Sequence, residues 1–153
     1  MIKIDLQRKT KPKVGRITYH WFENQNIGLP LTRFHAIEIP LELFNSGIEY
    51  ENQPVETSLL FEWIKLEIDD PLELDGLEIN SQKLPDMEAS IYLGAAHNWV
   101  NVCSLKINFE SNLQSRFNGM VEIDFETEGV AENETFTFEA TTQGCNPNLS
   151  PLF

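Results

Sequence analysis

Apolar and polar side chains alternate from residue 120 to residue 139, on both sides of a loop around Gly129. The apolar positions are Val121, Ile123, Phe125, Phe136, Phe138 and Ala140. Because successive side chains of a strand point to opposite faces of a sheet, this spacing predicts two strands with one buried face. The other face should be anionic, since the stretch holds seven carboxylates and no basic residue.

Similar short segments recur along the chain, with proline and glycine between them. We predict strands at residues 2–6, 16–22, 34–39, 59–68, 72–74 with 77–79, 89–93, 99–107, 121–127 and 135–142. Strands at this spacing, separated by turn signals, are typical of a sandwich or barrel. The pattern therefore predicts an all-β fold, a single-domain antiparallel β-sandwich or open barrel spanning residues 1–153.

Local signals add one hairpin and one or two short helical turns to this fold. Asp75-Gly76 suits the positive φ angles of a type I′ turn, so it predicts a hairpin between residues 72–74 and 77–79. Residues 40–46 end at Gly47, as a short helix with a glycine stop does. Residues 111–117 predict a further turn or two of helix between strands.

The composition is that of a globular but strongly acidic protein. Hydrophobic residues make up 41% of the 153 residues, which is enough for a core without metals or disulfides. The formal net charge is −13, although residues 1–16 form a basic amino-terminal segment with six cations and one acid. We interpret its Lys-Thr-Lys-Pro-Lys run as a solvated connector; docking on the anionic body is the alternative. Repulsion from phosphate disfavours nucleic acid and anionic membranes as ligands.

The chain carries no signal for export or for membrane insertion. It has no apolar run of about 18 residues, and its first residues lack the long apolar core of a secretion signal. We therefore expect a soluble, cytoplasmic protein. Cys103 alternates with strand residues and Cys145 lies in a Gly-Cys-Asn-Pro loop, so we expect two reduced thiols rather than a disulfide.

No motif for catalysis, metal binding or cofactor binding stands out. His20, His35 and His97 have no second histidine or cysteine at metal-ligand spacing, and a zinc site needs three or four such donors. The chain lacks a Gly-x-Ser-x-Gly elbow, and its glycines are dispersed rather than clustered in a phosphate-binding loop. We predict no catalytic residue, no metal site and no cofactor, which favours a noncatalytic protein.

The acidic strand pair indicates a surface for binding a basic protein. The predicted contact residues are Glu122, Asp124, Glu126, Glu128, Glu132 and Glu134. Carboxylates can occupy the positive cleft of a nuclease and speed association by electrostatic steering. The concrete hypothesis is an immunity protein or antitoxin that neutralises a cationic, nuclease-like toxin domain.

Two other classes of function stay open at this level. One is a small-molecule-binding β-barrel or an enzyme with a pocket near His97 and Trp99, next to a Gly-Ala-Ala turn. The other is an assembly protein that pairs through exposed strand edges. The sequence leaves strand order, oligomeric state and the convergence of the three histidines open.

Overall fold

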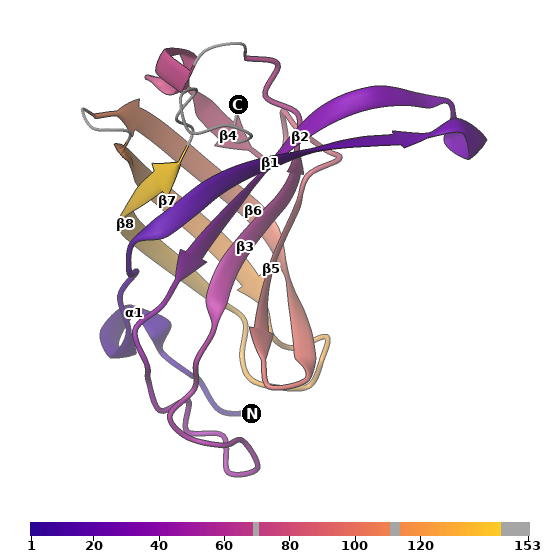
Figure 1. Cartoon of the computed structure of the whole chain (residues 1–153). Coiled ribbons are helices and arrows are strands. Elements are labelled where there is room, and N and C mark those ends of the chain that lie inside the picture. The colour runs from indigo at the N-terminus through magenta and orange to yellow at the C-terminus, as the bar shows by residue number, and fades with distance from the viewer. Residues whose placement is uncertain (69–70, 111–113, 145–153) are drawn as a thin grey trace.

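The described residues form one sheet of eight strands and three short helical turns (Figure 1). This computed structural model describes residues 1–68, 71–110 and 114–144. The elements are α1 (Leu6–Lys9), β1 (Gly15–Asn24), η1 (Gln25–Ile27), β2 (Leu29–Pro40), β3 (Ser58–Ile64), η2 (Pro71–Leu74), β4 (Glu78–Asn80), β5 (Glu88–Leu93), β6 (Ala96–Phe109), β7 (Gln114–Asp124) and β8 (Glu134–Gly144). The all-β prediction is confirmed.

The sheet closes on itself as a barrel. Its strand order is β4-β6-β5-β3-β2-β1-β8-β7, and β7 also pairs with β6. Neighbouring strands are antiparallel except β1 and β8, which run parallel and, within the described residues, pair from Gly15 to Ile17 on β1.

Aromatic and branched side chains fill the interior. The largest fully buried rings are Phe61 on β3, Phe117 on β7, Phe125 directly after β7 and Phe136 on β8. The six apolar positions of the alternating stretch are all buried, as the two-residue periodicity predicts. Gly119 lies on the same inward face, where a Cβ would meet the Phe138 ring at 2.4 Å.

The amino-terminal segment packs against the body rather than forming the predicted strand at residues 2–6. Ile4 and Leu6 are completely buried, and residues 6–9 form α1. The Lys-Thr-Lys-Pro-Lys run is no free connector, because the Lys13 amide donates to the Pro40 carbonyl and Pro12 forms a bridge with Leu41. Local alternation predicted a strand at residues 2–6, but the open edge of β8 offers burial to this segment as a helical turn.

Three other local predictions are wrong, because contacts with neighbouring segments replace the local preference of each stretch. Residues 40–46 are extended rather than helical, and Phe44 forms a bridge with Val55. Residues 71–74 form the 3-10 turn η2, while β4 pairs with β6, so no hairpin forms at Asp75-Gly76. Residues 114–117 belong to β7, and residues 111–113 lie outside the described residues.

Strands β1 and β2 are longer than predicted and extend beyond the barrel as a two-stranded ribbon, with η1 at its tip (Figure 1). Trp63 on β3 packs its ring against His20, Phe22 and Phe34 at the base of the ribbon. Its backbone φ is 58°, in a region that bulky residues rarely adopt, next to a bulge in the β2–β3 pairing. Among the described residues, no helix has the length and apolar character needed to cross a bilayer.

Candidate acidic and aromatic binding face

The predicted acidic residues lie on β7, on the following loop and at the start of β8. Glu122, Glu126, Glu128 and Glu132 are exposed, whereas Asp124 and Glu134 are half-buried. The ion pairs seen within the described residues involve none of the six. We call Glu122, Asp124, Glu126, Glu128 and Glu132 the acidic face.

Two members of the acidic face hold the β7–β8 loop in place. The Asp124 carboxylate accepts hydrogen bonds from the amide (3.0 Å) and the hydroxyl of Thr127. Those two bonds hold the pKa of Asp124 below its usual value. The Glu126 carboxylate accepts from the Asn133 amide, and the Glu126 amide donates to the Asn133 side chain. Glu122, Glu128 and Glu132 are thus the side chains left for a partner.

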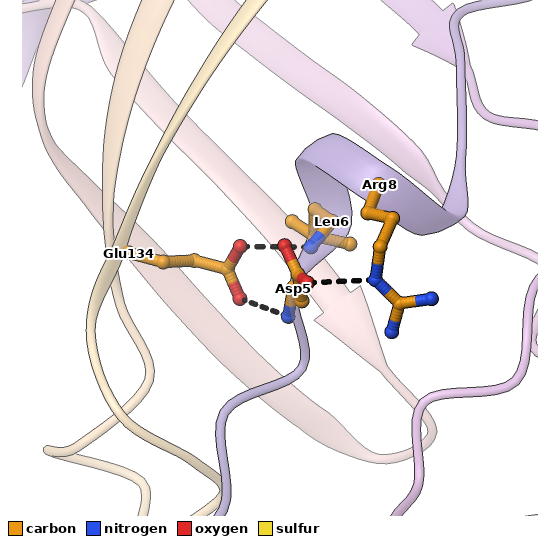
Figure 2. A network of polar contacts seen from close by, with 4 residues as sticks. All are labelled: Asp5, Leu6, Arg8 and Glu134. Atoms are coloured by element: carbon orange, nitrogen blue, oxygen red, sulfur yellow. Dashed lines mark hydrogen bonds and ion pairs between the residues drawn. The ribbon is translucent and has the colours of Figure 1, made fainter.

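Glu134 fastens the amino-terminal segment to β8 (Figure 2). Its Oε1 accepts a hydrogen bond from the Asp5 amide at 3.1 Å, and its Oε2 accepts from the Leu6 amide at 2.9 Å. Burial raises the pKa of Glu134, and the two amide bonds oppose that shift. Arg8 bonds the Asp5 carboxylate at 3.0 Å and holds the pKa of Asp5 below its usual value.

The register of β8 explains why the Glu134 side chain points inward. Glu134 lies directly opposite the buried Ile123 and two positions before Phe136, so it shares the inward face of β8 with Phe136. Its side chain therefore points toward the barrel end where α1 lies. The alternation that predicts an inward Phe136 also predicts an inward Glu134. The sequence therefore contains the signal for the inward position of Glu134.

A polar hollow of about 490 Å³ separates the amino-terminal segment from the acidic face. It is lined by Lys3, Asp5, Gln7, Asn101, Glu122, Ile123, Asn133, Glu134 and Thr135. Asn101 is the extra residue at the irregularity between β6 and β7, where Val100 pairs with Ile123 and Val102 with Glu122. The bulge therefore turns an amide side chain toward the carboxylates.

Three aromatic rings lie beside the acidic face. Tyr92 and His97 stack with ring centroids 4.3 Å apart, and Trp99 lies 4.4 Å from His97. We call these residues the aromatic stack. Tyr92 pairs with His97 across β5 and β6, and Trp99 pairs with Asp124 across β6 and β7. Tyr92 and Trp99 remain 44% and 42% exposed.

The histidines and the cysteine among the described residues do not meet in one catalytic site. His97 belongs to the aromatic stack, whereas His20 and His35 lie on the β1–β2 ribbon. Cys103 is buried, and burial raises the pKa of its thiol; Cys145 lies outside the described residues. Within the described ranges, no three His, Cys, Asp or Glu side chains are grouped to hold a metal ion.

Comparisons of the chain with protein-family models, curated proteins and solved structures find no match. The function is therefore argued from the geometry of the acidic face and the aromatic stack alone.

Proposed function

We propose that this protein is a noncatalytic binding module that docks a basic protein on its acidic face and aromatic stack. The observation that carries the proposal is the cross-strand pair of Trp99 and Asp124. It sets a half-exposed ring beside Asp124, whose carboxylate is held by Thr127, and near Glu122 on the same strand, which is exposed and left for a partner. Arginine suits such a site because its guanidinium can stack on a ring while it donates to a carboxylate.

The charge distribution supports a cationic partner over other classes. Of the charged residues on β7, the β7–β8 loop and the start of β8, only Arg116 is basic, and it forms ion pairs with Glu110 and Glu139. The acidic face itself has no neutralising cation within the described ion pairs. Such a surface attracts a basic protein over a distance of about one Debye length, about 8 Å at physiological salt.

The concrete form of the proposal is an immunity protein or antitoxin that acts in the cytoplasm. A toxin that cleaves nucleic acid needs a positive cleft for phosphates, and this face can fill such a cleft with carboxylates and a flat aromatic anchor. The aromatic stack would supply most of the affinity, since few contacts carry most of the binding energy. The carboxylates would chiefly speed association.

Charge reversal at Glu122, Glu128 and Glu132 tests the proposal without disturbing the loop. The triple variant E122K/E128K/E132K keeps the hydrogen bonds of Asp124 and Glu126, so its fold should persist. Basic proteins retained from lysate by the native chain at low salt should be lost from this variant, and the association rate of an identified partner should fall by about tenfold or more. The matched control E42K/E49K/E56K makes the same change in net charge on exposed positions of another loop.

The aromatic stack is tested separately with W99A. We expect a faster dissociation rate and a largely unchanged association rate, because the ring acts after encounter. Equal loss of binding in both triple variants would show that only total charge matters. Retention that is unchanged at high salt, in all variants, would refute the acidic face as the binding site.

The alternative of a pocket near His97 and Trp99 receives less support. Both rings lie on the outer surface in the aromatic stack, and the interior of the barrel is filled by the rings of β3, β7 and β8. We therefore propose no interior ligand.

A further inference from the structure

The polar hollow beside the acidic face adjoins the aromatic stack. Trp99 pairs with Asp124 across β6 and β7, and Asn101, two positions after Trp99, lines the hollow. Glu122 lies two positions before Asp124 and lines the hollow as well. Because the intervening Ile123 is buried, Glu122 and Asp124 share the outer side of β7. The half-exposed Trp99 ring and the hollow are therefore adjacent sites on one surface.

Glu122 is the carboxylate of the hollow that is left for a ligand. Asp5 and Glu134 also line the hollow, but Arg8 bonds the Asp5 carboxylate and two backbone amides bond the Glu134 carboxylate (Figure 2). Glu122 takes part in none of the ion pairs that the described residues form. The hollow of about 490 Å³ has room for a long basic side chain together with water.

The chain's own Lys3 shows that the hollow accommodates a cation. Lys3 lines the hollow. Its charge contributes to the lowered pKa of Asp5, after the Arg8 bond, and opposes the raised pKa of Glu134, which burial causes. Lys3 is exposed, and it belongs to no ion pair within the described part of the chain. A cation thus borders the carboxylates without being fixed there, so another basic side chain can take its place.

We propose that the partner presents two basic side chains at alternate positions of an extended segment, one stacked on Trp99 and the other bound by Glu122 in the hollow, in place of Lys3. This inference rests on the proposed function and adds to it the spacing of the partner's charges. Side chains two residues apart on a strand point the same way and lie about 7 Å apart. An extended segment laid along β7 therefore repeats the spacing from Asp124, beside Trp99, to Glu122.

The guanidinium of arginine fits both subsites better than the ammonium of lysine does. It is planar, so it stacks on an aromatic face such as Trp99, and it donates two parallel hydrogen bonds to a carboxylate such as Glu122. Lys3 lowers the affinity of the hollow for this group, because like charges repel one another. The amino-terminal segment therefore restrains the binding site that it borders.

Two blocked pentapeptides test the spacing. One carries arginine at its second and fourth positions and the other at its second and third, with glycine elsewhere, so the two have the same composition and charge. In NMR titrations at low salt, the dissociation constant of the alternate peptide should be about threefold lower, as expected for one additional exposed ion pair. E122Q should remove this difference, and W99A should weaken the binding of both peptides. E56Q, at an exposed carboxylate of another loop, should retain the difference.

Substitution of Lys3 tests the displacement. K3Q should bind the alternate peptide about threefold more tightly than the native chain does, since a competing exposed charge is lost. K13Q removes an exposed charge of the same segment that does not line the hollow, so its effect should be smaller.

Equal or undetectable binding of the two peptides by the native chain would overturn the inference. So would a difference that survives E122Q or is lost in E56Q, peptides that bind W99A as tightly as the native chain, or a K3Q variant that gains no more affinity than K13Q. The proposed function fails on a separate result, which is retention of the basic partner by E122K/E128K/E132K as strong as that by the native chain.

Discussion

At the scale of single residues, His35 shows how burial fixes a charge state. Its side chain is completely buried where the β1–β2 ribbon leaves the barrel, and it packs beside Tyr19. Burial lowers its pKa from 6.5 to about 4, and the positive charges of Arg33 and His20 add to that shift. Folded His35 is therefore neutral throughout the mildly acidic range.

This shift predicts a loss of stability in mild acid. The unfolded chain takes up a proton near pH 6.5 and the folded chain only near pH 4, so the stabilisation is complete above pH 6.5 and declines as the pH falls toward 4. The slope should reach up to about 1.4 kcal/mol per pH unit in urea unfolding. H35F, which keeps a ring beside Tyr19, should remove most of the slope above pH 5, whereas H97Q should retain it. A native slope that H35F leaves unchanged would assign the titration to another group.

The sequence correctly predicted burial at residues where alternation along a strand alone decides which side chains face the core. Val121 and Phe136 are buried as the alternation predicts. The alternation does not reveal the contacts of Glu134 with the amino-terminal segment, nor the bonds of Asp124 to Thr127, which depend on the turn that follows β7. Together with Glu126, which bonds Asn133, these side chains make contacts within the chain, so Glu122, Glu128 and Glu132 are left for a partner.

At the scale of elements, the amino-terminal segment lies against the first half of β8 and hydrogen-bonds to it. Gln7 acts as a surrogate strand residue, since its side-chain amide donates to the Thr137 carbonyl and accepts from the Thr137 amide. Glu134 accepts two more amides of the same segment. Covering a free edge with a helix or loop is a known way to prevent unwanted pairing, and here it also buries Ile4 and Leu6.

Removing the Glu134 carboxylate should loosen this segment. E134A leaves the Asp5 and Leu6 amides without their acceptor, so we expect the free energy of unfolding to fall by about 1–3 kcal/mol. Amides of residues 2–9 should also exchange faster with deuterium. E132A removes an exposed carboxylate two positions away and should change neither quantity. Equal protection of residues 2–9 in E134A and the native chain would mean that the burial of Ile4 and Leu6 and the bonds of Gln7 hold the segment without Glu134.

The bounds of an element were predictable where the local alternation of side chains alone specifies a strand. β5 and β8 lie within one or two residues of the predicted bounds. In β8, buried and exposed side chains alternate regularly from Thr135 to Ala140. The predicted helix at residues 40–46 and the strand at residues 2–6 failed, since each of those segments takes its conformation from a partner far along the chain.

At the scale of the whole molecule, the net charge of −13 opposes compactness. Carboxylates outnumber basic residues 24 to 11, and their mutual repulsion is stronger in the folded chain than in the expanded one. We expect the melting temperature at pH 7 to rise by a few degrees, about 2–4 °C, between low and physiological salt. The triple variant E42K/E49K/E56K should show a smaller rise. A melting temperature that falls with added salt would mean that attractive ion pairs outweigh the repulsion.

The sequence by itself determined the fold class, the inward set of the strands and the excess of negative charge. All three follow from local periodicity and composition, which need no knowledge of what lies next to what. Only the tertiary structure decided that the sheet closes through β6 and β7, that Trp99 lies beside Asp124, and that Glu134 binds the amino-terminal segment. These depend on contacts between residues that are distant in sequence, because strand order and register are set by the packing of the whole barrel.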